Sequence, residues 1–317
     1  MEIIDTYEVI IVGGGPAGLS AGIIASIKGL KTAVFEGGTF GGLLSTIYPH
    51  KTIYNYPATP RIRADHLVSE WVRQAADHDV ILKRERVLKI HPNKIIETEG
   101  GNYSAKVVII ATGMRPNTLG IKGEVKFARK NRGVFPYVTD PAIFRDRTVL
   151  VVGGGDTALD AVVDLCDLAK EVYLAHRRNE FRAAEMTLEK VMKGELCAKI
   201  FLNTEIEEIS GTKEVEAAIL RNNETGTKSE LKVDRVILAV GLIPNTEIFD
   251  ELGLEMAGKY LKTDEYMRTN VEGIFAAGDI VSPYQLAVVA ASQGALAAHG
   301  AYMYIRKPYW RKEHLKE

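Results

Sequence analysis

The feature that most constrains this chain is a stretch of eleven residues that occurs twice. Residues 9–19 (VIIVGGGPAGL) return 140 positions later as residues 149–159 (VLVVGGGDTAL). A second pair, residues 111–117 (ATGMRPN) and 239–245 (AVGLIPN), follows the apolar segments 107–110 and 236–238. This period is far longer than that of a solenoid repeat. The chain is therefore expected to contain two homologous domains.

Each copy opens with the pattern of a dinucleotide-binding fold. The β-branched run predicts a buried parallel strand, and the glycines predict a tight turn. The Ala-rich continuation predicts a helix whose amino end faces a pyrophosphate. The residues that fill the pattern are Gly13, Gly15 and Gly18 in the first copy and Gly153, Gly155 and Ala158 in the second. We expect an α/β fold with two Rossmann-like domains of the three-layer ββα type.

The residue after the next predicted strand differs between the copies. Segment 32–35 is followed by Glu36, 23 residues after Gly13, and segment 171–175 is followed by His176, 23 residues after Gly153. A carboxylate at this place accepts hydrogen bonds from both hydroxyls of an adenosine ribose. It would also repel a 2′-phosphate. The first copy is therefore expected to bind FAD.

The second copy replaces the carboxylate with cations. Arg177, Arg178 and Arg182 follow His176 and are suited to charge-assisted hydrogen bonds with a 2′-phosphate. The alternative is a solvated basic turn. Binding of a 2′-phosphate makes NADPH the expected ligand, and two nucleotide sites in one chain imply hydride transfer between them.

The last third of the chain is expected to complete the first domain. Gly278-Asp279 follows a predicted short strand in 269–277, where a carboxylate can hold the ribityl hydroxyls of a flavin. Gly-Asp is also common in ordinary turns. Residues 286–304 are Ala-rich and predict a helix. The FAD-binding domain is therefore expected at 1–116 and 245–317, with the NADPH-binding domain inserted at 117–244.

Composition excludes several classes of partner. The 40 Lys and Arg balance 41 Asp and Glu, so no net field favours nucleic acid. Apolar runs are only strand-length, so no membrane span is expected, and the acidic residues 1–5 are unlike a signal peptide, which favours a cytoplasmic location. Cys166 and Cys197 are too few for a disulfide framework, a zinc site or a Cys-x-x-Cys pair, and are expected to be packing residues. No metal site is indicated.

These motifs resemble the low-molecular-weight thioredoxin reductases over nearly the whole chain. The most specific segments are 153–158 (GGGDTA) and 176–183 (HRRNEFRA). That family carries a Cys-x-x-Cys shortly before the second glycine turn, where this chain has 133–140 (GVFPYVTD), with Tyr137 and Asp140 at the cysteine positions. Without that dithiol, electrons cannot reach a thioredoxin disulfide by the family's route.

Segments 41–54, 60–64 and 138–141 are more similar to the branch without the dithiol, the thioredoxin-reductase-type ferredoxin–NADP⁺ reductases. The resemblance implies a homodimer, and a Tyr48 that stacks on the isoalloxazine ring rather than packing as an ordinary loop residue. The residues expected to contact FAD are Gly13, Gly15, Pro16, Ala17, Gly18, Glu36, Gly42, Leu43, Tyr48, Val87, Ala111, Thr112, Gly113, Asp279 and Ile280. Those expected to contact NADPH are Gly153, Gly155, Asp156, Thr157, Ala158, His176, Arg177, Arg178 and Arg182.

Three positions depart from that branch. Leu43 stands in place of a Gln, Gln285 stands in place of a Lys, and segment 307–310 (KPYW) replaces a longer tail that covers the flavin with an aromatic ring. The new segment either supplies such a ring or only anchors the tail.

The function that fits these features is an NADPH–ferredoxin oxidoreductase. The flavin would carry the chemistry, so no catalytic side chain is expected. The basic segment 122–132 either docks an acidic ferredoxin or is a solvated linker. Two alternatives stay open. The electron acceptor could be a quinone, dioxygen or a partner's disulfide, or the protein could be a non-enzymatic sensor of NADPH that holds a flavin.

Overall fold

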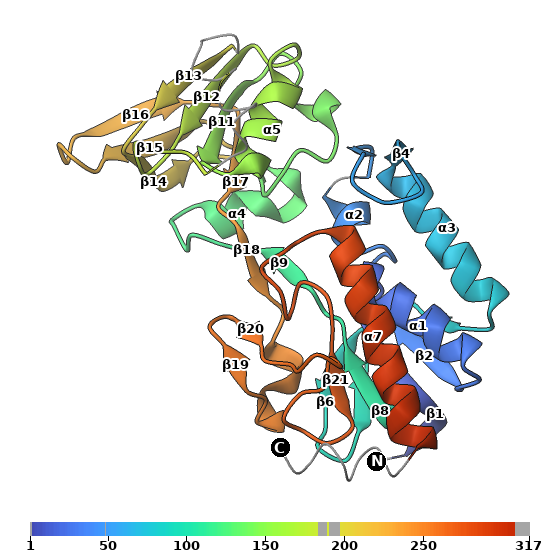
Figure 1. Cartoon of the computed structure of the whole chain (residues 1–317). Helices are drawn as coiled ribbons and strands as arrows, with labels where there is room; N and C mark the ends of the chain where they lie inside the picture. Colours follow the sequence, from blue (N-terminus) through green and yellow to red (C-terminus); the bar gives the residue numbers. More distant parts are fainter. Residues whose placement is uncertain (1, 48, 183–188, 190–196, 308–317) are drawn as a thin grey trace. The chain divides into compact units, whose positions relative to one another are not determined.

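The computed structural model describes residues 2–47, 49–182, 189 and 197–307, and its fold is α/β (Figure 1). The chain divides into two compact units, Met1–Arg115 with Ile243–Glu317, and Pro116–Leu242. Within the described ranges, no helix is long and apolar enough to cross a membrane, and no three acidic, His or Cys side chains gather as a metal site.

The first unit is built on a sheet with the strand order β5-β2-β1-β8-β7-β6. β1 pairs in parallel with β2 and β8, and β2 pairs in parallel with β5. The long strand β8 has antiparallel β7 along its first half and parallel β21 along its last residues. The strands of the sheet are β1 (Ile3–Val12), β2 (Thr32–Phe35), β5 (Ile81–Lys83), β6 (Val87–Ile90), β7 (Ile95–Thr98), β8 (Gly101–Ile110) and β21 (Ile274–Ala276).

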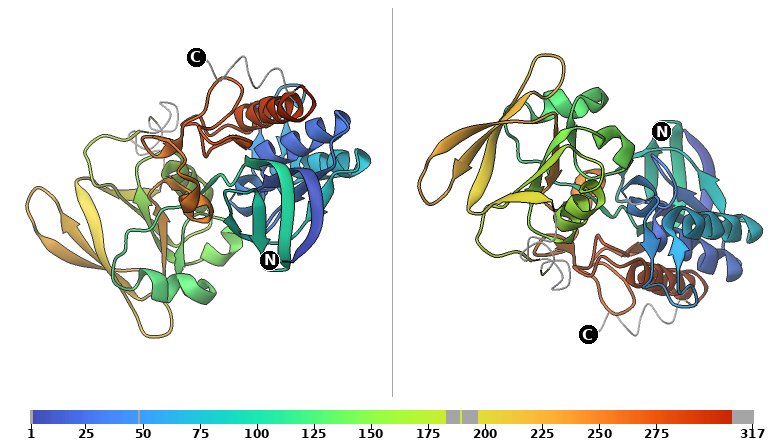
Figure 2. Two further views of the ribbon diagram at one scale, coloured as in Figure 1. Left: turned by 90° about the horizontal axis from the view of Figure 1, so that it is seen from below. Right: turned by 90° about the horizontal axis from the view of Figure 1, so that it is seen from above.

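Helices cover one face of this sheet. α1 (Pro16–Ile27) packs against both α3 (Ala64–Asp77) and α7 (Ala287–Arg306), and both views of Figure 2 show the red α7 alongside the blue α1. Small residues permit this close packing, because a side chain at Gly294 of α7 would overlap the backbone of Ala17. The remaining elements of the unit are α2 (Leu43–Thr46), β3 (Thr52–Ile53), β4 (Ile62–Arg63), η3 (Glu247–Leu252), β19 (Met256–Ala257) and β20 (Tyr260–Leu261).

The second unit is built on a wholly parallel sheet with the order β10-β17-β11-β12-β13. α5 packs on one core face, and an antiparallel sheet of β14, β15 and β16 packs on the other. The elements are α4 (Glu124–Ala128), η1 (Arg129–Asn131), β10 (Val134–Phe135), η2 (Pro141–Phe144), β11 (Thr148–Gly153), α5 (Asp156–Leu165), β12 (Glu171–Ala175), β13 (Ala198–Phe201), β14 (Thr204–Ser210), β15 (Ala217–Asn222), β16 (Lys228–Lys232) and β17 (Arg235–Ala239).

The predicted repeat is confirmed in three dimensions. β1 lies between β2 and β8, and β11 lies between β12 and β17 in the same order. The predicted closing strands, 107–110 and 236–238, lie in β8 and β17. Where the chain passes between the units, β9 (Met114–Pro116) pairs with β18 (Leu242–Pro244). The helix predicted at 286–304 is α7.

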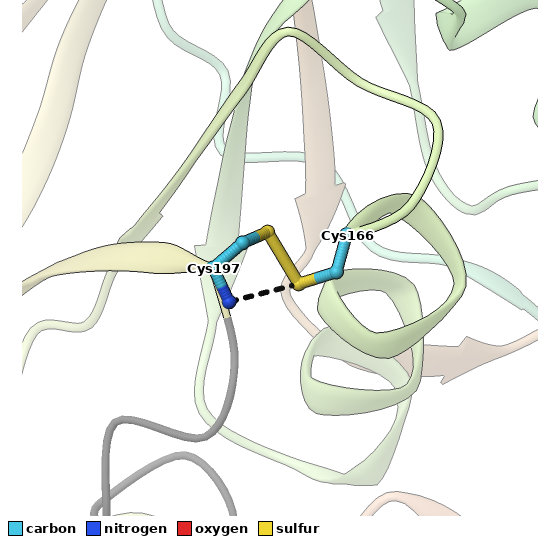
Figure 3. Close-up of a disulfide and its surroundings, with 2 residues drawn as sticks. All are labelled: Cys166 and Cys197. Carbon is cyan, nitrogen blue, oxygen red and sulfur yellow. Dashed lines mark hydrogen bonds between the residues drawn. A yellow bond between two sulfur atoms is a disulfide. The ribbon is translucent and has the colours of Figure 1, made fainter.

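One prediction about the cysteines is wrong. Cys166 and Cys197 do not pack separately but form a disulfide, with Cα atoms 5.4 Å apart (Figure 3). The two residues are 31 positions apart, and no local pattern in the sequence pairs them. The pairing arises because α5 and β13 flank the same strand end, a contact that only the folded sheet creates.

Candidate functional site

The first glycine turn connects β1 to α1. Gly13 has a φ of +110°, and a Cβ there would overlap the carbonyl oxygen of Ala111, so only glycine fits. α1 begins at Pro16 with Gly15 as its N-cap and no side-chain cap. A Cβ added at Gly15 would have the Gly42 Cα, 3.9 Å away, as its nearest neighbour, which leaves room for a ligand. The free N–H groups of this helix start form an anion site.

Glu36 is fixed at the end of β2 by two backbone amides. Gly14 N–H donates to its Oε2 at 2.8 Å, and Gly38 N–H donates to its Oε1 at 2.7 Å. A carboxylate has about four acceptor positions, so each oxygen can still accept a hydroxyl hydrogen. Glu36 therefore sits beside the turn as a preset acceptor for two neighbouring hydroxyl groups.

Asp279 follows β21 near the same turn. A Cβ on its neighbour Gly278 would lie 2.8 Å from the Cβ of Ala17 in α1. Burial raises the pKa of Asp279 to about 6, and its carboxyl has no hydrogen-bond partner within the described residues. The Gly278 N–H donates to Oε1 of Gln293 in α7 at 2.9 Å. An unpaired, largely buried carboxyl at this place is ready to bind a hydroxyl-rich ligand.

The other residues predicted for the first site lie at different depths. Ala111, Thr112 and Gly113 follow β8. The Thr112 hydroxyl donates to the Asn245 carbonyl at 2.9 Å, and the Asn245 side-chain Nδ2–H donates to the Thr112 carbonyl at 2.8 Å. Gly42 caps the short helix α2, in which Leu43 is half-buried. Val87 and Ile280 have buried side chains in the core of the sheet's other face. Tyr48 and residues 308–310 lie outside the described part of the chain.

The second glycine turn lines a cavity of about 550 Å³ within the second unit. Most of the residues predicted for this site line it, namely Gly153, Gly155, Thr157, His176, Arg177, Arg178 and Arg182. The opposite wall comes from Leu119, Ile206 and Gly241. Asp156 and Ala158 are not in the lining, and Ala158 is fully buried against the turn. The space beside Gly155 is open, so a phosphate can approach the start of α5.

His176 forms a wall of this cavity and packs over Gly154. Its ring stacks on Phe181, with centroids 5.0 Å apart, and its Nε2–H donates to the Glu180 carbonyl at 2.9 Å. Burial lowers the pKa of His176, and the neighbouring Arg177 lowers it further. The imidazole is therefore neutral at pH 7 and contributes shape rather than charge.

The cationic side chains beyond His176 are exposed, while their backbone is held. Arg182 N–H donates to the Gly154 carbonyl at 2.7 Å, and the Arg178 carbonyl accepts from the Asn203 N–H at 3.2 Å. Arg177, Arg178 and Arg182 have no carboxylate partner among the residues described. Three unpaired guanidinium groups on a fixed backbone make a site for a doubly charged anion.

Sequence reasoning missed several residues that shape these sites. Gln293 is the polar residue of an otherwise small and apolar stretch of α7, which is a usable signal. Phe40 and Phe181 pack beside the two turns, and Gly41 N–H donates to the Gly14 carbonyl at 2.7 Å. Nothing in the local sequence distinguishes those three contacts from ordinary packing.

Known proteins share this arrangement. The sequence model of the pyridine nucleotide-disulphide oxidoreductase family matches residues 7–294. The ferredoxin–NADP reductase of Thermus thermophilus is 34% identical over 314 residues, covering 95% of this chain and 93% of that protein. A thioredoxin reductase of Treponema pallidum is 38% identical over 306 residues, covering 94% and 97%. The solved thioredoxin reductase of Lactococcus lactis superposes with a TM-score of 0.86 at 32% identity, covering 94% of this chain and 99% of that one. The chain belongs to the pyridine nucleotide-disulphide oxidoreductase family.

Proposed function

We propose that this flavoprotein oxidoreductase transfers electrons from NADPH through FAD to a ferredoxin. FAD and NADPH are the cofactors of thioredoxin reductases and ferredoxin–NADP reductases. We assign residues 1–116 with 245–317 to the binding of FAD and residues 117–244 to the binding of NADPH. When bound, FAD accepts a hydride and can release its electrons one at a time.

The first glycine turn has the features that FAD requires. The amides at the start of α1 face the pyrophosphate, and Glu36 accepts the two ribose hydroxyls of the adenosine. Asp279 accepts from the ribityl chain, which gives its unpaired carboxyl a partner. Gln293 holds the backbone before Asp279 and so positions that carboxyl.

The second glycine turn has the features that NADPH requires. Arg177, Arg178 and Arg182 bind the 2′-phosphate, and the start of α5 binds the pyrophosphate. The neutral His176 fills the space beside Gly154 and adds no charge that would bind a competing anion more deeply in the cavity.

The observation that carries the choice of acceptor is the chemistry at positions 137 and 140. Thioredoxin reductases are expected to hold a dithiol there, whereas here Asp140 accepts a hydrogen bond from the Ala142 N–H at 2.9 Å and caps η2. Both cysteines of the chain are joined elsewhere, at the far end of α5. An acceptor that takes electrons directly from the flavin is therefore favoured, and the relative from Thermus thermophilus bears the name of such an enzyme.

Segment 122–132 supports docking of an acidic protein. Lys122 is paired with Glu208 at 2.7 Å and Lys126 donates to the Gly211 carbonyl, whereas the exposed Arg129, Lys130 and Arg132 have no such partners in the described chain. These three free cations are available to carboxylates of a ferredoxin.

We also propose that the protein forms a homodimer. Light scattering, which gives the mass of the particle in solution, tests this.

The test is anaerobic stopped-flow spectroscopy of the flavin-loaded protein. NADPH should bleach the flavin faster than NADH does, and an oxidised low-potential ferredoxin should restore its absorbance through repeated turnovers. Bleaching without turnover on ferredoxin would point to a quinone, dioxygen or a disulfide as the acceptor. Binding of NADPH without any bleaching would favour the remaining hypothesis, a non-enzymatic sensor of NADPH.

Variants of segment 122–132 test the docking surface. K130N/R132N should lower kcat/KM for ferredoxin by about 3- to 10-fold at low salt and leave the rate of bleaching by NADPH unchanged. The matched control K170N/K232N removes two exposed charges elsewhere in the same unit and should change neither rate. Equal losses in both variants would remove the docking role.

A further inference from the structure

The disulfide between Cys166 and Cys197 lies on the second unit, at the opposite end of α5 from the glycine turn (Figure 3). We propose that it is a thiol–disulfide exchange site whose oxidation state sets how tightly Arg177, Arg178 and Arg182 hold a 2′-phosphate. The coupling rests on the proposed function, whereas the exchange chemistry rests on the two cysteines alone.

The bridge is accessible to a small thiol or dithiol. Cys197 is exposed and Cys166 is half-buried, so an attacking thiolate reaches the Sγ of Cys197 first. The backbone N–H of Cys197 donates to the Sγ of Cys166 at 3.2 Å. This hydrogen bond stabilises the negative charge that develops on Cys166 when the S–S bond breaks, which makes Cys166 the leaving group.

The exchange balances with a dithiol as the reductant. Its first thiolate bonds to Cys197 Sγ, and the electron pair of the broken S–S bond moves to Cys166, which takes up a proton. Its second thiolate then attacks its own sulfur in the mixed disulfide and releases Cys197, which takes up the second proton. The dithiol leaves as a disulfide, and two electrons and two protons stay on the protein.

One route from the bridge to the cavity runs along α5. Its N-cap is Gly155 in the glycine turn, and its C-cap is Cys166. Ten helical residues span about 15 Å, so the bridge does not touch a nucleotide but fixes the far end of the helix that presents the anion site. Leu165, beside Cys166, is fully buried in the core under α5.

The second route runs along β13, a strand of four residues at the edge of the sheet, which pairs with β12 and with no other strand of the described chain. Cys197 directly precedes it. At its other end, the Phe201 carbonyl accepts from His176 N–H at 2.9 Å, and Asn203 N–H donates to the Arg178 carbonyl at 3.2 Å. Short edge strands open locally at low cost in free energy. The bridge therefore restrains the strand that holds the backbone of the arginines.

The two cysteines also enclose the arginines in a covalent loop. They are 31 residues apart, and β12 and the segment 176–182 lie between them. Reduction opens that loop and increases the number of conformations that the segment must give up to bind a phosphate. The oxidised protein is pre-organised for the 2′-phosphate, and the reduced protein has to be ordered by it.

The test uses the full-length, flavin-loaded protein equilibrated in reduced or oxidised dithiothreitol. Thiol titration of the native protein should find two thiols in the first buffer and none in the second, because the chain has only two cysteines. Calorimetry should show 2′,5′-ADP binding about 3- to 10-fold more tightly to the oxidised form. Binding of 5′-AMP, which lacks the 2′-phosphate, should change by less than about 2-fold.

The C166S/C197S variant is the matched control. It should bind 2′,5′-ADP with the Kd of the reduced protein in both buffers. If this variant does not fold, the comparison of the native chain in the two dithiothreitol buffers is sufficient for the test. Two titratable thiols in oxidised dithiothreitol, or equal Kd values for 2′,5′-ADP in the two states, would overturn this inference and leave the proposed NADPH site in place. No binding of 2′,5′-ADP in either state would overturn both the proposed NADPH site and its coupling to the bridge.

Discussion

The two glycine turns share a backbone plan and differ in the side chain that packs against the middle glycine. Gly14 accepts at its carbonyl from Gly41 N–H at 2.7 Å, and Gly154 accepts from Arg182 N–H at the same distance. Each turn leads into a helix capped by glycine without a side-chain cap. The two turns are therefore alike beyond the repeated motif. In each, a residue outside the motif, Gly41 or Arg182, donates its backbone N–H to the carbonyl of the middle glycine.

The difference lies in what each middle glycine faces. Gly14 donates its N–H to the Glu36 carboxylate, whereas a Cβ on Gly154 would overlap the ring of His176. Under the proposed function, the anion at the first turn would select hydroxyl groups, and the neutral ring at the second would leave selection to the arginines beyond it. One backbone plan would then serve two ligands because a single position, 23 residues after the first glycine, changes its charge.

The surroundings of the two helices differ as well. α1 is packed by the long helices α3 and α7, whereas α5 packs on β11, β12 and the short helix η2. The first turn is therefore braced by more of its unit than the second. The disulfide at the end of α5 supplies one of the restraints on the second turn that packing supplies on the first.

The largest expected effect comes from removing the cations of the second turn. R178A/R182A should raise the Kd of 2′,5′-ADP by at least about 100-fold, because each charge-assisted hydrogen bond contributes about 10- to 100-fold. The Kd of 5′-AMP should stay within about 3-fold, and the flavin content should not change. Calorimetry measures the two Kd values, and the ratio of flavin absorbance to protein absorbance in the purified protein measures the flavin content.

E36A is the converse change at the first turn. It should lower flavin content and leave 2′,5′-ADP binding intact. If R178A/R182A weakened 5′-AMP as much as 2′,5′-ADP, the arginines would not be reading the 2′-phosphate, and the comparison between the turns would fail.

Local patterns were enough to predict the framework of both turns. Strands 32–35 and 171–175 coincide with β2 and β12, and the helix expected at 286–304 is α7. These predictions succeed because a buried parallel strand and an Ala-rich helix are specified by residues that are neighbours in the chain. The difference between Glu36 and His176 was also visible, since its spacing from the glycines is fixed by the length of one strand–turn–helix unit.

Contacts between distant residues could not be predicted in this way. Cys166 meets Cys197 only because β13 becomes an edge of the sheet beside the end of α5. The stacking of His176 on Phe181 and over Gly154 depends on a turn whose path the sequence does not specify. The role of Gln293 depends on α7 returning to the first turn from the far end of the chain.

The charge state of the first turn depends on Asp279. Burial raises the pKa of Asp279 to about 6, above the unfolded value of 3.8, so the folded protein favours its protonated form. The resulting stability is fully present below pH 3.8 and is lost as the pH rises through about 6. At pH 8 the ionised carboxyl costs up to about 3 kcal/mol in the flavin-free protein.

D279N should remove that cost. Its free energy of unfolding in urea, measured without flavin, should exceed that of the native chain at pH 8 by up to about 3 kcal/mol, and the gap should close towards pH 4. D77N, at an exposed site in α3, is the control for the loss of one carboxylate elsewhere in the same unit. Flavin affinity should fall in D279N. A constant gap at all pH values would show that Asp279 does not titrate as its burial implies.

The smallest effects come from adding single methyl groups to the turns. In G154A the new Cβ meets the His176 ring, and in G14A it meets Phe40 and Glu36, so each variant should lose about 1–3 kcal/mol of stability through overpacking. In G155A and G15A the Cβ enters open space or lies 3.9 Å from Gly42, so the melting temperature should stay within about 2 °C of the native value.

The same four variants separate packing from ligand approach. G155A should weaken NADPH because its methyl group stands where the pyrophosphate must approach α5, while 2′,5′-ADP, which reaches the arginines without a pyrophosphate, should be affected less. G15A should lower flavin content for the same reason at the first turn. If G155A proved as destabilising as G154A without any ligand, the space beside Gly155 would not be open. Gly15 and Gly155 would then not be equivalent positions in the two turns.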